Sequence, residues 1–259
     1  MILKLKKFII FILVKYLKNL SPIRRANLLN NIIGNSVKEE SPEKSLQFLF
    51  DLDNRLYFLE GKLAVLYGKG IHTKHKHINY HQFFIKNINS DEHILDIGSG
   101  NGLLCYEMVT QVQGVKVVGV EINERNFKFA CSHYQHPNLS FINKDATTDL
   151  PDEKFDVVTM SNILEHIENR IAFLNNIRKK VKPKRLIIRV PFFERDWRVP
   201  LKKELGIDYH LDSTHFIEYT EQEFLSELKH ANLLTIHIEF KWGEIWSVVQ
   251  PLDMEDIND

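Results

Sequence analysis

The stretch HILDIGSGNGLL, residues 93–104, joins a short apolar run to three glycines placed at every second residue: Gly98, Gly100 and Gly102. A new apolar run begins at Leu103. This order is typical of a buried strand that ends in a tight turn and continues as a helix. Glycine in such a turn lets backbone amides approach a ligand beside a helix N-terminus. The stretch therefore predicts a ligand-binding loop at the carboxyl end of a strand.

From Asp91 onward the chain repeats this alternation of short apolar segments and helical stretches. The apolar segments VKVVGVEI, LSFINKD, FDVVTMS and RLIIRVP alternate with helical stretches, as in a parallel sheet that is covered on both faces. Residues 233–250, LLTIHIEFKWGEIWSVVQ, indicate two strands joined by a short turn, which must be antiparallel. We predict a Rossmann-like, doubly wound α/β sheet, mostly parallel with a C-terminal antiparallel hairpin, preceded by N-terminal helices.

The glycine spacing separates candidate ligands. A dinucleotide loop has G-x-G-x-x-G, whereas this loop is G-x-G-x-G followed by Leu103, and no Lys-Ser/Thr pair follows as in a nucleoside triphosphate loop. Glu121 ends the second predicted strand, where a carboxylate accepts hydrogen bonds from ribose hydroxyls. Asp145 follows the third strand, where it would meet an adenine amino group. The pattern favours a nucleoside.

Together these motifs resemble the class I S-adenosylmethionine-dependent methyltransferases, over roughly Tyr80 to Pro251. FDVVTMSNILEHIEN, residues 155–169, is similar to the fourth-strand motif of that superfamily. The resemblance implies S-adenosyl-L-methionine as cofactor, with the first loop at its methionine part. The implied cofactor-binding residues are Asp96, Gly98, Ser99, Gly100, Gly102, Glu121, Ile122, Asp145, Ala146 and Ser161. A dinucleotide-dependent oxidoreductase of the same architecture is the alternative.

His166 is the candidate catalytic residue. It follows the fourth strand, whose carboxyl end borders the methyl-transfer centre in enzymes of this type, and histidine suits a general base at neutral pH. A hydroxyl acceptor would need such a base. The alternative is that Glu165 and His166 only shape the loop and order the cofactor.

Two segments are candidates for binding the acceptor. The segment GIHTKHKHINYH, residues 70–81, is predicted to be a loop that forms a lid over the cofactor, with His72, Lys74 and His75 as substrate-binding residues. Solvated loop histidines are the alternative, and no metal site is expected because the spacing fits no standard zinc pattern. The segment after Arg189 is predicted to run for about 28 residues without a helix and to shape the acceptor pocket.

In that second segment, Arg195, Trp197 and His210 are the substrate-binding candidates, as parts of a polar floor with aromatic walls. Such a surface suits a sugar or a polar head group. The alternative places Arg195 and Asp196 in structural salt bridges and Trp197 in the core.

The N-terminal region is basic, since Glu39 is the first acidic residue. Lys4, Lys7, Lys15 and Lys18 fall on one face of a predicted helix whose other faces are apolar, which favours a membrane interface. A helix packed on the core or on a second subunit is the alternative. We divide the chain into this segment (residues 1–33), a helical lead-in with a histidine-rich lid (34–90) and a cofactor-binding domain (91–259).

The formal net charge is zero, and no motif of a nucleic-acid methyltransferase is present, so nucleic acid is not the expected partner. The two cysteines, Cys105 and Cys131, are expected to be buried, unpaired thiols of a reducing compartment. We therefore expect a cytoplasmic methyltransferase, associated with the inner face of the membrane, that methylates an oxygen of a small polar or lipid-linked, saccharide-type acceptor. A catalytically silent S-adenosylmethionine-binding sensor or scaffold is the alternative; the sequence does not indicate the oligomeric state.

Overall fold

The computed structural model describes the backbone of residues 2–69 and 73–252. The chain divides into two compact units, Met1–Glu60 and Gly61–Asp259. The division falls inside the predicted lead-in segment, and the three-part division made from the sequence stays a prediction.

The first unit is helical. It contains α1 (Ile2–Lys18), α2 (Pro22–Ser36) and most of α3 (Pro42–Tyr67). Ser21 caps α2 by accepting a hydrogen bond from the Arg24 amide, and Pro22 occupies the first turn, where its missing N–H costs nothing. The side chains of α1 from Phe8 to Val14 are exposed. Among the described residues, no helix combines the length and the apolar content needed to cross a membrane.

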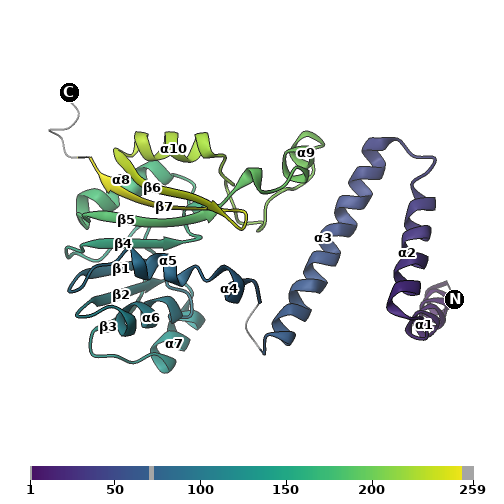
Figure 1. Ribbon diagram of the computed structural model, residues 1–259, viewed down its shortest axis with the longest axis horizontal. Coiled ribbons are helices and arrows are strands. Elements are labelled where there is room, and N and C mark those ends of the chain that lie inside the picture. The colour runs from purple at the N-terminus through teal and green to yellow at the C-terminus, as the bar shows by residue number, and fades with distance from the viewer. Residues whose placement is uncertain (1, 70–72, 253–259) are drawn as a thin grey trace. The chain divides into compact units, whose positions relative to one another are not determined.

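The second unit is built on a seven-stranded sheet with strand order β3-β2-β1-β4-β5-β7-β6 (Figure 1). The strands are β1 (His93–Ile97), β2 (Lys116–Glu121), β3 (Leu139–Asn143), β4 (Val157–Ser161), β5 (Arg185–Pro191), β6 (Leu233–Lys241) and β7 (Glu244–Pro251). β1 to β5 pair in parallel, and β7 runs antiparallel to both β5 and β6. The predicted fold class is confirmed.

Alternate residues of the strands supply two separate cores, because successive side chains point to opposite faces. On one face, Leu95 and Val158 pack with α8 (Arg170–Lys180) and α10 (Glu221–His230). On the other face, Ile94 and Val157 pack with α5 (His81–Lys86) and α6 (Leu103–Gln111). Helix α7 (Glu124–His133) contacts β2 and β3.

Three expectations about local structure were wrong. The histidine-rich segment is partly helical: α4 (Thr73–Ile78) forms because its last residue, Ile78, is buried in the second core. The segment after β5 is also not continuous loop, since it holds the 3₁₀ turn η2 (Phe193–Arg195) and α9 (Arg198–Glu204), which buries Val199. Cys105 is buried as expected, but Cys131 is exposed on α7.

The strand order places the candidate site. The strand order reverses between the neighbouring strands β1 and β4. Open α/β sheets bind ligands at the carboxyl ends of the strands around such a switch point. The glycine loop follows β1, and the 3₁₀ turn η1 (Leu164–His166) follows β4. Both therefore lie at the same edge of the sheet.

Candidate functional site

The glycine loop turns through left-handed conformations. The φ angles of Gly98, Gly100 and Gly102 are 73°, 56° and 85°. Their amides donate within the protein: Gly98 to the Val120 carbonyl at 2.8 Å, Gly100 to Glu121 Oε2 at 2.7 Å and Gly102 to the Ser99 carbonyl at 2.9 Å. The amides of Gly98 and Gly100 thus have partners in β2 and that of Gly102 has one in the turn itself, and the approach of this backbone to a ligand stays a prediction.

Two of these positions have no room for a Cβ atom because neighbouring side chains pack against them, whereas the third borders open space. A Cβ at Gly98 would lie 2.0 Å from Ile163 Cδ1, so the glycine loop lies directly against the segment that follows β4. A Cβ at Gly102 would lie 2.7 Å from Phe141 Cζ. A Cβ at Gly100 would meet no heavy atom within 4 Å, so this residue faces the space in which a ligand is expected.

Glu121 is buried beside this space. Its two carboxylate oxygens accept hydrogen bonds from the amides of Gly100 and Asn123, each at 2.7 Å. Each oxygen keeps a second lone pair, so the carboxylate can still accept the hydroxyls of a ribose. The next residue, Ile122, is 66% exposed and offers an apolar surface for a base. Asp145 accepts from the amide and hydroxyl of Thr147, and Ala146 is buried.

Asp96 lies beneath the loop in the core of the sheet. Its oxygens accept hydrogen bonds from Thr159 Oγ1 at 2.6 Å and Cys105 Sγ at 3.1 Å. Burial raises the pKa of Asp96 from 3.8 to about 6. Both oxygens are thus engaged inside the protein, and its predicted contact with the cofactor stays a prediction. Ser99 Oγ, in contrast, is buried without a partner among the described residues, as expected of a group that meets a ligand.

A buried ion pair borders the site at the end of β5. Arg189 donates to Glu244 through Nε at 2.6 Å and Nη2 at 2.7 Å, and through Nη1 to Ser161 Oγ at 2.9 Å. Tyr80 places its ring 3.9 Å from the guanidinium carbon. Lys74 reaches Glu244 Oε1 at 3.2 Å, so this candidate acceptor ligand belongs to the same network. Glu244 was not predicted from the sequence, although an acidic residue in the apolar run WGEIWSVV was a signal.

The turn after β4 carries an unusual carboxylate. Asn162 has a φ of 57°, and its amide donates to the Arg189 carbonyl, which directs the chain into η1. Glu165 in η1 is 0% exposed, and neither of its carboxylate oxygens has a hydrogen-bond partner among the described residues. Burial raises the pKa of Glu165 to about 8, with further contributions from the charges of Glu218 and Glu244.

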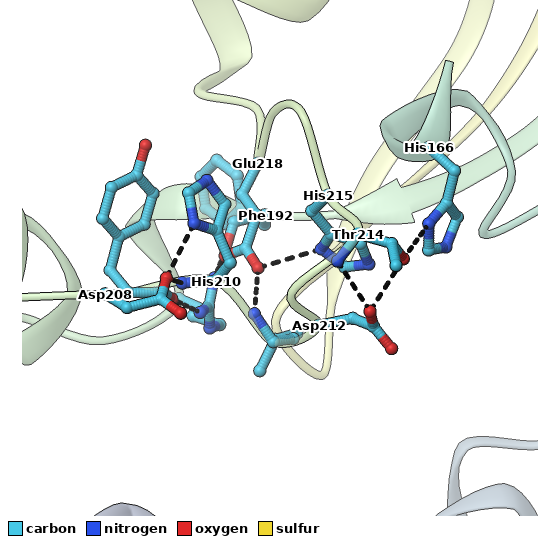
Figure 2. A network of polar contacts seen from close by, with 11 residues as sticks. His166, Phe192, Asp208, His210, Asp212, Thr214, His215 and Glu218 are labelled. Carbon is cyan, nitrogen blue, oxygen red and sulfur yellow. Dashed lines mark hydrogen bonds and ion pairs between the residues drawn. The ribbon is translucent and has the colours of Figure 1, made fainter. Parts of the chain in front are cut away.

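Beside this carboxylate, Figure 2 shows His166 and His215 facing each other. Their rings are 4.6 Å apart and nearly perpendicular. His215 belongs to the segment that returns from α9 to α10, and the Phe216 amide fixes it by donating to the Glu165 carbonyl at 2.8 Å. Burial, followed by the neighbouring His215, lowers the pKa of His166 below its ordinary value. Its imidazole is therefore neutral near pH 7.

The other candidates in this segment have structural partners. Arg195 forms an ion pair with Glu218 and donates to the carbonyls of Phe192 and Tyr209. His210 bonds to Asp208 at 2.8 Å (Figure 2), whereas Trp197 is 69% exposed and not in the core. Their role as acceptor ligands stays a prediction. His72 lies outside the described residues, and only the backbone of His75, in α4, is described.

Two cavities flank the site. One of about 530 Å³ is lined by His166, Phe216, Thr147 and residues of α8, including Phe173. The other, of about 710 Å³, is lined by Lys69, Lys76, Tyr80, His81 and Leu103. Both have the size of small-molecule sites. Glu165, His166 and His215 also form a group whose ligand-type atoms lie within 4.8 Å of one another and could hold a metal ion. Sequence spacing could not reveal this group, because His215 is remote in the chain.

Comparison with known proteins agrees with this geometry. A family model described as "Methyltransferase domain" matches residues 71–238. A ubiquinone biosynthesis O-methyltransferase of Bartonella tribocorum is 31% identical over 62% of this chain and 65% of the relative. One from Rhodopseudomonas palustris is 30% identical over 45% of this chain and 46% of the relative. This chain thus spans less than two thirds of the length of these relatives.

Solved structures share the fold at low identity. A magnesium protoporphyrin IX methyltransferase from Synechocystis, solved with bound S-adenosylhomocysteine, has a TM-score of 0.54 at 15% identity and covers 68% of this chain and 84% of its own. A small RNA methyltransferase has a TM-score of 0.55 at 16% identity, over 68% of this chain and 25% of its own.

The raised pKa of Asp96 predicts a pH-dependent stability. Unfolded Asp96 releases its proton near pH 3.8 and the folded form near pH 6, so the folded state holds more protons in this interval. Relative to Asp96→Asn, we expect the free energy of unfolding of the wild type to fall by roughly 2 to 3 kcal/mol between about pH 4 and about pH 7, and to level off above this range. Urea unfolding of both proteins across this range measures the difference. A constant or rising difference would contradict the assignment.

Proposed function

Because the chain belongs to the methyltransferase-domain family, we propose that it transfers the methyl group of S-adenosylmethionine to a hydroxyl oxygen of a lipid-linked small molecule. The contact between Gly98 and Ile163 carries the proposal. It brings the cofactor loop against the turn that bears His166, and so sets the nucleoside site beside a group suited to activating an acceptor.

The residues around the glycine loop fit the cofactor. Gly100 leaves space, Glu121 offers buried lone pairs to the ribose, and the exposed Ile122 suits the face of the adenine. When bound, S-adenosylmethionine supplies a methyl group made electrophilic by the sulfonium. The protein then has to hold the acceptor in line with that methyl group, and positioning of this kind supplies much of the acceleration.

A hydroxyl acceptor is supported by two observations. The relatives are named O-methyltransferases, and the neutral His166 at the methyl-transfer edge suits a group that handles a hydroxyl proton. His166 and Phe216 line the cavity of about 530 Å³, which gives the acceptor a place beside that imidazole. Phe216 comes from the segment after β5, in line with the expectation that this segment shapes the acceptor pocket.

A lipid-linked acceptor is supported by α1. Its exposed apolar side chains, including Phe8, Ile10 and Phe11, are accompanied by a basic face and by no acidic residue before Glu39. Such a helix binds at the interface of an anionic membrane, where a lipid-linked acceptor resides. We propose a cytoplasmic protein docked on the inner face of the membrane in this way.

Removing the ribose carboxylate tests the cofactor site. We expect Glu121→Ala to weaken S-adenosylhomocysteine binding by roughly 2 to 3 kcal/mol, since two charge-assisted hydrogen bonds are lost. Isothermal titration calorimetry measures the affinity, and circular dichroism checks folding. Glu124→Ala, which removes an exposed carboxylate three residues later, is the control and should bind as the wild type does. Equal affinity for both variants would refute the assignment of Glu121.

The reaction itself is tested with tritiated S-adenosylmethionine and two acceptors, a prenylated catechol and a lipid-linked saccharide. We expect alkali-stable label in one of the two lipid extracts. His166→Ala should lower turnover by about 10²-fold or more while S-adenosylhomocysteine affinity stays within about twofold. His230→Ala, an exposed histidine of α10, is the control. Label found only in protein or RNA would refute the proposal, and binding without turnover in cell extract would favour the silent sensor.

Membrane docking is tested with vesicles. The full-length protein should sediment with phosphatidylglycerol-containing vesicles and much less with pure phosphatidylcholine, and added salt should weaken the association. Deletion of residues 1–20 should abolish sedimentation without changing the thermal unfolding of the sheet domain. Unchanged vesicle binding after the deletion would show that another surface is responsible.

A further inference from the structure

The cluster at the end of β4 joins residues that are far apart in the sequence. Glu165 and His166 come from η1, and His215 comes from the segment before α10, so that their ligand-type atoms lie within 4.8 Å of one another. The backbone bond from the Phe216 amide to the Glu165 carbonyl holds the two segments in register. The arrangement is therefore fixed by the backbone.

Glu165 supplies an independent reason to expect a ligand. It is 0% exposed, and both of its oxygens lack a hydrogen-bond partner among the described residues. Leaving a buried carboxyl group without any partner costs free energy, and native proteins rarely do so without a functional reason. A cation at the centre of the cluster would satisfy both oxygens.

The hydrogen bonds of the two histidines indicate which ring nitrogen carries the proton. Thr214 Oγ1 donates its only proton to Asp212 at 2.7 Å, so it must accept at His166 Nδ1, 2.8 Å away (Figure 2). His166 Nδ1 therefore carries the proton, and the Nε2 lone pair is available to a ligand.

His215 also has a hydrogen-bond partner at Nδ1. Its Nδ1 lies 3.2 Å from Glu218 Oε1, and this carboxylate already accepts from the Leu211 amide and from Arg195. A carboxylate in that position accepts and does not donate, so His215 Nδ1 carries a proton and Nε2 is left for the cluster. Histidine ligands of metal ions are typically oriented in this way, by a carboxylate or another acceptor on the second nitrogen.

We propose that Glu165, His166 and His215 bind a divalent transition-metal ion and leave coordination positions open. Two imidazoles and one carboxylate suit zinc, manganese, cobalt or iron, and three protein ligands with an open position are typical of catalytic sites. The proposal rests on the O-methyltransferase function and specifies how the acceptor is activated. His166 then acts by holding the ion, and does not remove the proton itself.

The open position receives the acceptor hydroxyl, whose pKa the ion lowers. The hydroxyl proton leaves to water. The acceptor oxygen then forms a bond to the methyl carbon while the carbon–sulfur bond breaks, and the electron pair of that bond stays on sulfur. The products are the methyl ether and S-adenosylhomocysteine, so no oxidant or reductant is needed.

Cobalt(II) is the probe, because its visible absorption reports binding to nitrogen and oxygen ligands. Full-length protein treated with a chelator should show a saturable cobalt spectrum. His215→Ala and the isosteric Glu165→Gln should each lower cobalt affinity about 100-fold, and Thr214→Val, which removes only the partner of His166 Nδ1, by about tenfold. His230→Ala should bind as the wild type does. An unsaturable spectrum, or one unchanged in His215→Ala, would overturn the proposal.

Two further measurements separate this proposal from the proposed function. S-adenosylhomocysteine affinity, measured on the same proteins, should not change in His215→Ala. Methyl transfer by the wild type should stop with chelator and return with cobalt, manganese or zinc. Full methyl transfer in the metal-free protein would overturn the metal site and leave the O-methyltransferase function standing. Cobalt binding without methyl transfer to any acceptor would support the metal site and overturn the O-methyltransferase function.

Discussion

The absence of a side chain at Gly98 is the constraint on which the site depends. Because this residue adopts a φ of 73° and has no Cβ, the turn after β1 can lie against Ile163. Any larger residue would force the Ile163 side chain to move and would be strained at this positive φ. The contact joins the glycine loop to the turn that bears Glu165 and His166. The proposed cofactor site and the proposed acceptor site are thus held together by packing.

Buried charges give the rest of the site its rigidity. Arg189 forms two hydrogen bonds to Glu244 and one to Ser161, so the carboxyl ends of β4 and β5 are tied to the beginning of the antiparallel strand β7. Glu218 is held by Arg195 and by the Leu211 amide. Although burial opposes its ionisation, the hydrogen bonds from His215 and Leu211 and the charge of Arg195 lower the pKa of Glu218. A paired buried charge of this kind resists displacement, because removing one partner strands the other. Glu165 differs from both, since neither of its carboxylate oxygens has a partner in the part of the chain that the structure describes, and this difference supports the proposed role of Glu165 as a ligand.

Much of the fold could be predicted from the sequence, because buried parallel strands appear there as short, nearly continuous apolar segments. The sequence also placed Gly98, Gly100 and Gly102 directly after β1 and Glu121 at the end of β2, because a tight turn and a strand end confine such residues to fixed positions in the chain. It could not predict that the amides of Gly98 and Gly100 have their partners in β2, since this depends on how the turn packs on the neighbouring strand. Nor could it show that Arg195 and Lys74 have acidic partners in distant segments.

The sequence by itself determined the alternating sheet, the nucleoside-type loop and the basic apolar helix at the start, because each of these is written in the local periodicity and spacing of residues. Only the tertiary structure decided which side chains meet. His215 lies beside Glu165 because a backbone hydrogen bond and the return of the chain from α9 to α10 bring it there. Contacts between residues far apart in the chain arise from packing, and no local pattern records them.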